Sequence, residues 1–166
     1  MIIRQATQHD VPAIATIHVR SWQHAYRDLL PADQLAALSI EDRVQQWQRQ
    51  LASTMHTIVA EIDGAVVGFA SWDMNPDSQP ASAMLYSIYL APAAMGKGTG
   101  SALLEQVERD TIAAGAIEGL LHVLADNAPT RAFYERHGWR VVPDSAQTEH
   151  FFGIDVHTVA YRKHFP

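Results

Sequence analysis

The sequence contains no cysteine and no long apolar run. Without cysteine, a disulfide and a thiol nucleophile are both excluded, and a structural zinc site loses its usual ligand. No apolar stretch approaches the roughly 20 residues that a helix needs to cross a bilayer, and the N-terminus lacks the charged-then-apolar pattern of a secretory signal. We therefore expect no membrane partner and a cytoplasmic location.

Positive charge is also scarce. Twelve Lys and Arg stand against eighteen Asp and Glu, which gives a net charge of -6. This balance argues against a nucleic-acid partner and is compatible with a cationic small substrate. The length of 166 residues and the 48% hydrophobic composition predict one globular domain over residues 1–166.

Helical spacing dominates the first fifty residues. Residues 1–6 predict a short strand, and Thr7 followed three residues later by Asp10 is typical of a helix start. Trp22 and Tyr26 continue the apolar face of that helix. A further helix with regularly spaced apolar residues is predicted from Ile40 to Leu51.

A β-hairpin is predicted for residues 57–72. Its flanks are rich in β-forming residues, and the Asp63-Gly64 pair suits a type I′ turn. Glu61, close to the turn, is expected to be a solvated strand end.

The most informative stretch runs from residue 83 to residue 107. An apolar and aromatic strand, Ala83–Leu90, is stopped by Pro92, and helical spacing resumes after three glycines at alternate positions, Gly96, Gly98 and Gly100. The glycines therefore lie in a strand-to-helix turn, where backbone N–H groups and the positive end of the helix dipole meet. Such a turn predicts a phosphate site.

Two common phosphate motifs do not fit this turn. A P-loop would need glycine in place of Ala91, and Ser or Thr in place of Gly98 directly after Lys97. The dinucleotide fingerprint fails because Gly100 comes one residue early and because the turn lies in mid-chain. A nucleotide-binding module is therefore disfavoured, although binding of ATP or NAD without CoA would revive it.

A second motif lies about thirty residues further on. Residues 121–139 read Leu-His-Val-Leu-Ala-Asp-Asn-Ala-Pro-Thr-Arg-Ala-Phe-Tyr-Glu-Arg-His-Gly-Trp. Together with the glycine turn, this pattern resembles the acetyl-CoA-binding half of the GCN5-related N-acetyltransferase (GNAT) superfamily, most closely over residues 55–140. The resemblance implies an α/β (α+β) fold whose mixed, mostly antiparallel sheet is flanked by helices and splayed at its central strands. It also implies acetyl-CoA as cosubstrate, with no metal.

The resemblance carries over to particular residues. The turn would hold the pyrophosphate, the end of the preceding strand would pair with pantetheine, and the helix after Asn127 would complete the cofactor site. The cofactor-binding residues implied are Ile88, Tyr89, Leu90, Gly96, Lys97, Gly98, Thr99, Gly100, Ser101, Asn127, Arg131 and Tyr134. Asn127 can also cap the helix that follows it.

Two residues are candidates for proton transfer. Tyr134 aligns with the tyrosine that protonates the CoA thiolate in many GNAT enzymes, and the alternative is an aromatic packed on the sheet. Phe133 beside it is expected to take that packing role. His122 lies one residue before the strand position where ribosomal-protein N-acetyltransferases of this family place a catalytic glutamate, and imidazole suits proton transfer at neutral pH. The alternatives for His122 are a packing residue, with a water chain as the base.

The sequence departs from the family pattern in two places. Met95 stands where Arg or Gln usually heads the phosphate loop, and the strand Ala83–Leu90 lacks the glutamate base of histone-type members. We expect Lys97 and Arg131 to compensate for the missing side chain. An alternative function, compatible with both departures, is a CoA-binding sensor or accessory protein without transfer activity.

The acceptor is expected to be a primary amine on a small molecule or a peptide, and the residues do not identify it. Trp22 and Tyr26 either wall the acceptor pocket, as the resemblance implies, or pack in the core. Residues 144–150 are expected to form a loop that shapes this pocket, before closing strands in residues 151–162. The histidines of the last thirty residues show no metal-binding spacing, and we expect them to be unrelated surface or strand residues; they are His137, His150, His157 and His164. A homodimer, common in the family, is compatible with the resemblance, although no residue demonstrates one.

Overall fold

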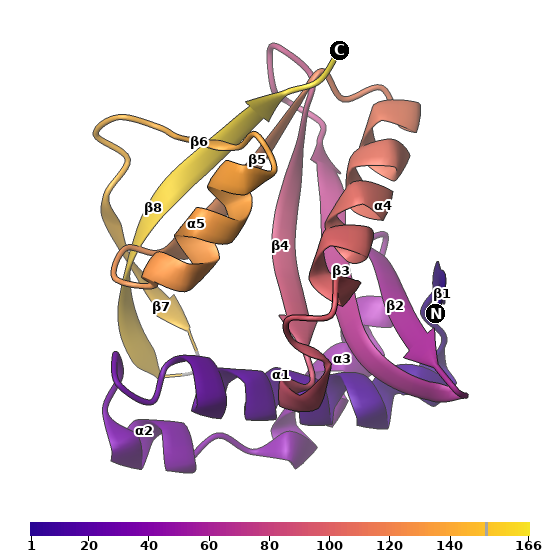
Figure 1. Cartoon of the computed structure of the whole chain (residues 1–166), viewed down its shortest axis with the longest axis vertical. Coiled ribbons are helices and arrows are strands. Elements are labelled where there is room, and N and C mark those ends of the chain that lie inside the picture. Colours follow the sequence, from indigo (N-terminus) through magenta and orange to yellow (C-terminus); the bar gives the residue numbers. More distant parts are fainter. Residues whose placement is uncertain (152) are drawn as a thin grey trace.

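The structure is a computed structural model that describes residues 1–151 and 153–166, so Phe152 of the predicted closing strands lies outside the described residues. Helices and strands come mostly in runs of the same kind along the chain (Figure 1). In chain order they are β1 (Ile2–Gln5), the short 3-10 helix η1 (Gln8–Asp10), α1 (Val11–Ala25), α2 (Ala32–Ala36), α3 (Ile40–Leu51), β2 (His56–Ile62), β3 (Ala65–Asn75), β4 (Ser82–Leu90), η2 (Pro92–Ala94), α4 (Thr99–Ala113), β5 (Glu118–Leu124), α5 (Ala128–Arg136), β6 (Arg140–Val141), β7 (Gln147–Phe151) and β8 (Ile154–His164).

The strands form one eight-stranded sheet in the order β1-β2-β3-β4-β5-β8-β6, with β7 also paired to β8. Only the β4–β5 pair is parallel among the described strands. That pairing covers Ser82–Leu85 against Glu118–Leu121 and then stops, although β4 continues to Leu90 and β5 to Leu124. The sheet is therefore mostly antiparallel and splayed at its central strands, which confirms the predicted fold.

Helices cover both faces of the sheet because successive strand residues point to opposite sides. On one face, Leu103 and Leu104 of α4 pack with Ile58 and Ala70. Val59 and Phe69, the chain neighbours of Ile58 and Ala70, point to the opposite face of the sheet. There they pack with Ile14 of α1 and Trp47 of α3, which are also buried. Figure 1 shows α4 and α5 on either side of the gap at the front, with α1 crossing below it.

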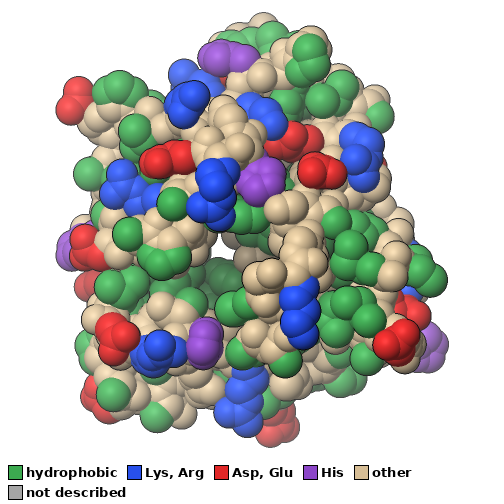
Figure 2. Space-filling view, in the orientation of Figure 1, with side chains coloured by type: hydrophobic (Ala, Val, Ile, Leu, Met, Phe, Trp, Pro, Cys, Tyr) green, Lys and Arg blue, Asp and Glu red, His purple; other side chains and the backbone are tan. Residues whose placement is uncertain are grey.

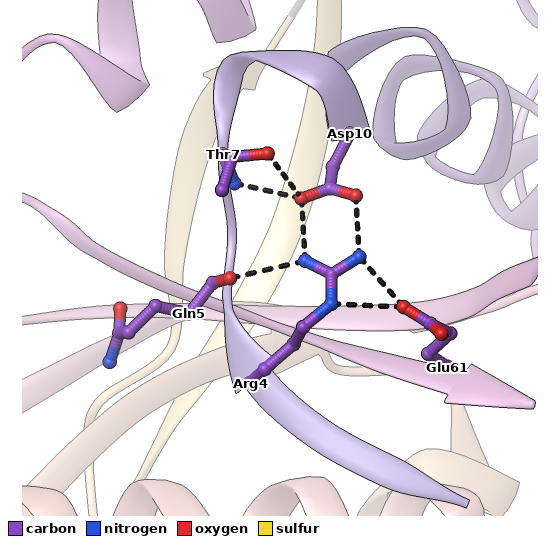
Figure 3. Close-up of polar contacts among 5 residues, drawn as sticks. All are labelled: Arg4, Gln5, Thr7, Asp10 and Glu61. Atoms are coloured by element: carbon purple, nitrogen blue, oxygen red, sulfur yellow. Dashed lines mark hydrogen bonds and ion pairs between the residues drawn. The ribbon is translucent and has the colours of Figure 1, made fainter. Parts of the chain in front are cut away.

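The N-terminal corner is held by an ion-pair network (Figure 3). Both terminal nitrogens of Arg4 bind the Asp10 carboxylate, at 2.8 and 2.9 Å, and its Nε donates to Glu61 at 2.9 Å. The Thr7 N–H donates to the same Asp10 carboxylate at 2.8 Å, which confirms the predicted helix start. The expectation that Glu61 is a solvated strand end is wrong, because β1 pairs with β2 and brings Arg4 within reach.

The hairpin prediction is confirmed, and the loop prediction for residues 144–150 is partly wrong. Asp63 and Gly64 have φ values of 51° and 80°, as a type I′ turn requires. Residues 147–151, however, form β7, which pairs with residues 154–158 of β8. The polar composition of β7 gives no apolar alternation, and the strand forms because the long β8 offers a free edge beyond β6.

Candidate functional site

The glycine turn leads directly into α4, as predicted. Gly96 and Gly98 have φ values of 73° and 82°, a left-handed conformation that other residues rarely adopt, and nothing lies within 4 Å of the Cβ that either position would carry. Backbone conformation, and not space, therefore requires glycine here. The first helical hydrogen bond runs from Ala102 N–H to Gly98 C=O, so the N–H groups of Thr99, Gly100 and Ser101 precede the helical ladder.

The gap between β4 and β5 has a polar backbone edge. Ala91 N–H donates to Val67 of β3 at 2.8 Å, and peptide groups alternate in direction along a strand. The N–H and C=O groups of Ile88 and Leu90 therefore face the gap, whereas those of Tyr89 face β3. The Leu90 carbonyl accepts a hydrogen bond of 2.6 Å from the buried Ser21 hydroxyl of α1. Figure 2 shows this face hollowed in the middle, between the regions of α5, α1 and the start of α4.

α5 begins beside the gap. Asn127 is its N-cap, and its side chain accepts the Thr130 N–H at 3.4 Å, which confirms the capping role. Arg131 Nε donates to the Tyr161 hydroxyl at 2.9 Å and Nη1 donates to the Ala125 carbonyl at 2.8 Å. Two of its donors are thus engaged within the protein, and the first of these bonds raises the pKa of Arg131.

Tyr134 is more deeply buried than its neighbour Phe133. It is 5% exposed and belongs to the core cluster beneath α4 and α5, on which Phe133 packs from the side. The expectation that Phe133 alone fills the packing role is therefore wrong. Burial, with Tyr89 nearby, raises the pKa of Tyr134 above its ordinary value of 10.0, so the phenol stays protonated well beyond neutral pH.

Sequence reasoning took His137 for an unrelated surface or strand residue, but it ties α5 to the glycine turn. Its Nδ1 lies 2.8 Å from the Phe133 carbonyl, and its Nε2 lies 3.0 Å from the Ser101 hydroxyl. A carbonyl only accepts, so Nδ1 carries a proton and donates to Phe133, and Nε2 shares a hydrogen bond with the Ser101 hydroxyl. Its place directly before Gly138, at the end of α5, was the available signal.

Trp22 and Tyr26 lie in a buried aromatic cluster on the α1 side of the gap. Trp22 Nε1 donates to the Tyr89 hydroxyl at 2.9 Å, and Tyr26 is hydrogen-bonded to the same tyrosine. His18 stacks on Tyr89 with ring centroids 5.1 Å apart and accepts the Trp47 Nε1–H at 3.1 Å. Desolvation lowers the pKa of His18 to about 3, so this imidazole is neutral. The aromatic cluster places the Tyr89 side chain on α1 and away from the gap edge.

His122 is the first residue of β5 beyond the β4 pairing. Its Nδ1 lies 3.0 Å from the Gln147 amide nitrogen and 3.3 Å from Glu149 Oε1, both on β7. Its side chain is 29% exposed, so the imidazole is neither a core residue nor fully solvated. Sequence reasoning missed Gln147 and Glu149 because their segment was assigned to a loop.

Among residues 1–151 and 153–166, no helix is long and apolar enough to cross a membrane, and no three His, Cys, Asp or Glu side chains group as metal ligands. The chain thus places a phosphate-type turn, an open strand edge, a buried tyrosine and a His–Gln–Glu group around one splayed sheet.

Comparison with known proteins identifies the class. A sequence profile of the Acetyltransferase (GNAT) family matches residues 11–139, and the chain belongs to this family. It is 29% identical over 137 residues to YuaI of Bacillus subtilis, described as an uncharacterized N-acetyltransferase, which covers 81% of this chain and 78% of that protein. It is 27% identical over 156 residues, 89% of each chain, to the peptidyl-lysine N-acetyltransferase YiaC of Escherichia coli. The activity class is therefore that of an acyltransferase.

The fold agrees with this class. The PaiA N-acetyltransferase of Thermoplasma acidophilum, solved in complex with coenzyme A, superimposes with a TM-score of 0.73 at 20% identity. The alignment covers 99% of this chain and 98% of that one.

Proposed function

We propose that this protein transfers an acetyl group from acetyl-CoA directly to a primary amine. The observation that carries the proposal is the glycine-opened start of α4 beside the unpaired end of β4. A single ligand with a diphosphate for the turn and an extended chain for the strand edge would fit both features. Family membership and relatives named as acetyltransferases favour a working enzyme over a CoA-binding sensor.

Acetyl-CoA would bind by its two polar segments. The backbone from Gly96 to Ser101 would receive the pyrophosphate, where free N–H groups and the helix dipole coincide. The peptide groups of Ile88 that face the gap would pair with pantetheine as an added strand, and the Leu90 N–H beyond them would face the thioester. A bound structure with CoA is known for the Thermoplasma protein of the same fold, which supports this cofactor.

Lys97 and the backbone N–H groups of the turn would supply the phosphate contacts that Met95, in place of the usual Arg or Gln, does not. Met95 contributes no charge, and Lys97 is exposed within the turn. Arg131 has two donors committed to Tyr161 and Ala125, so its help would require a change in these contacts. Asn127 lies at the N-cap of α5, beside the gap, where a cofactor contact is compatible with its capping bond.

The reaction would run as a direct transfer. The acceptor ammonium loses a proton to His122, its nitrogen attacks the thioester carbonyl carbon, and the Leu90 N–H stabilises the oxyanion. The tetrahedral intermediate collapses, the C–S bond breaks, and Tyr134 gives its proton to the CoA thiolate. The attacking nitrogen releases its extra proton to form the neutral amide, and that proton returns through solvent to the tyrosinate. The raised pKa of Tyr134 keeps that proton available at neutral pH. Trp22 and Tyr26 would wall the acceptor side of the gap.

Calorimetry with acetyl-CoA and a thiol-release assay against a panel of amines test the proposal. We expect heat with acetyl-CoA, none with ATP or NAD, and thiol release only when an amine is present. Gly98→Ala should raise the Kd for acetyl-CoA about tenfold, because alanine resists the left-handed conformation by roughly 1–2 kcal/mol.

Gly115→Ala is the matched control. Gly115 has a φ of 98° and nothing within 4 Å of its would-be Cβ, but it lies beyond the opposite end of α4. Both variants strain one left-handed residue, and only Gly98→Ala should weaken cofactor binding. Equal Kd values for the two variants would remove the turn from the cofactor site.

A further inference from the structure

Three strands present a polar patch on the face that α1 covers at its lower end. Cross-strand register places His122 of β5 opposite Ala160 of β8, and Gln147 and Glu149 of β7 opposite Thr158 and Val156. Paired residues of neighbouring strands point to the same side. Val156 packs with Trp22 and Tyr26 of α1, so the whole row shares the α1 face.

The patch is continuous with the predicted acceptor walls. Leu124, two residues after His122 on β5, packs in the cluster that contains Trp22 and Tyr26. Phe151, two residues after Glu149 on β7, has its ring centroid 6.4 Å from that of Trp22. α1 and α2 lie across the lower ends of β7 and β8 in Figure 1. The side chains of His122 and Glu149 therefore lie on the same face of the sheet as the aromatic cluster, two residues before the strand positions that contact it.

One carboxylate oxygen of Glu149 is held by neighbouring side chains, but the other has no hydrogen-bond partner. Its Oε1 accepts the Gln147 amide at 2.6 Å and lies 3.3 Å from His122 Nδ1. Its Oε2 is buried without a hydrogen-bond partner, and so is the hydroxyl of Thr158 on the neighbouring strand. No Lys or Arg forms an ion pair with Glu149 among residues 1–151 and 153–166. The side chain remains 21% exposed, so part of it reaches the surface beside the buried oxygen.

An unpartnered carboxylate oxygen in such a position is costly, because it has lost water and gained no donor. A carboxylate only accepts hydrogen bonds, so the missing partner is a donor. The last torsion of a glutamate is broad, so in the proposed complex a rotation would bring one oxygen toward the exposed part of the side chain. A cationic N–H donor satisfies both the geometry and the charge.

We propose that Glu149 binds the ammonium group of the acceptor, so that the substrates of this protein are cationic primary amines. This inference rests on the proposed acetyl transfer and adds the residue that selects the acceptor. Gln147 orients the carboxylate, and His122 stands beside the bound ammonium as the group that takes its proton. An amine that is neutral in solution gains nothing from Glu149.

Glu149→Gln tests the inference because it keeps the shape of the side chain and removes its charge. The probes are a lysine peptide with a blocked N-terminus, spermidine, and 4-methoxyaniline, an arylamine that is neutral at pH 7.5. For the best cationic amine we expect KM to rise about tenfold or more, as for a lost charged hydrogen bond, with little change in kcat. The kcat/KM for 4-methoxyaniline and the Kd for acetyl-CoA should stay the same.

Two further variants complete the design. Glu149→Asp keeps the charge and should recover part of the lost affinity for the cationic amine. Glu105→Gln removes an exposed carboxylate of α4 and should change neither KM. An unchanged acetyl-CoA Kd in Glu149→Gln shows that the variant is folded.

The outcomes separate the two proposals. If wild type acetylates amines but Glu149→Gln leaves the cationic KM unchanged, or raises both KM values equally, the role of Glu149 is refuted and acetyl transfer stands. If the wild type prefers 4-methoxyaniline over both cationic amines, the role of Glu149 is likewise refuted and acetyl transfer stands. If acetyl-CoA binds and no amine is acetylated, acetyl transfer is refuted and this inference with it.

Discussion

The Arg4–Asp10–Glu61 network makes the stability of the fold depend on pH in a calculable way. The Asp10 carboxyl is only 7% exposed, and its hydrogen bonds with Arg4 lower its pKa from 3.8 to about 2. A shift of this size corresponds to about 2 kcal/mol of folding free energy, since each pKa unit is worth roughly 1.4 kcal/mol. The folded pKa lies below the unfolded one, so this contribution is present above about pH 4 and is lost as the pH falls toward 2.

Asp10→Asn removes the titrating group and keeps its shape. Urea denaturation followed by tryptophan fluorescence should show the variant about 2 kcal/mol less stable than wild type at pH 7. The difference should shrink steadily between pH 4 and pH 2.5, because wild type loses the same contribution there. Other carboxyls also titrate in this range, and the difference between the two proteins cancels them.

Asp77→Asn provides the control, since Asp77 is an exposed turn residue. Its stability difference from wild type should stay near zero at every pH. A gap between wild type and Asp10→Asn that is equally large at pH 7 and pH 3 would refute the reasoning, because the loss would then come from packing and not from charge.

Two predictions concern the proposed chemistry. Tyr134→Phe should leave the Kd for acetyl-CoA unchanged and lower kcat about a hundredfold, as expected for loss of a general acid, in a thiol-release assay; an unaltered kcat would assign Tyr134 to packing alone. His122→Ala should likewise keep cofactor binding and lower turnover well over tenfold. Turnover equal to wild type would remove His122 from the mechanism and leave a water chain as the base.

The local signals in the sequence were sufficient where backbone geometry sets the structure. The turn at Gly96 and Gly98 has left-handed φ values, which only glycine adopts at low cost, so these glycines mark the turn in the sequence. The Asp63-Gly64 pair marks its turn in the same way, because a type I′ turn matches the twist of a hairpin. The splayed sheet itself was implied by the resemblance to the GNAT family that the glycine turn and the motif around Asn127 carry.

Contacts between distant segments were not readable in the same way. Glu61 is paired because β1, some fifty residues earlier, lies beside β2, and β7 forms because β8 is long enough to offer it an edge. Glu149 becomes a candidate only when β7 is known to be a strand. Register across three strands brings it to His122, and composition carries no trace of that register.

The splay between β4 and β5 also bears on pairing between the sheets of two copies of this protein. Two strand edges without partners normally invite another chain to add to the sheet. Here both edges face each other inside the fold, with α1 below and α4 and α5 on either side (Figure 1). A strand from a second copy would have to displace these helices to pair with either edge. The gap that would receive the cofactor in the proposed function thus also guards the sheet against edge-to-edge aggregation.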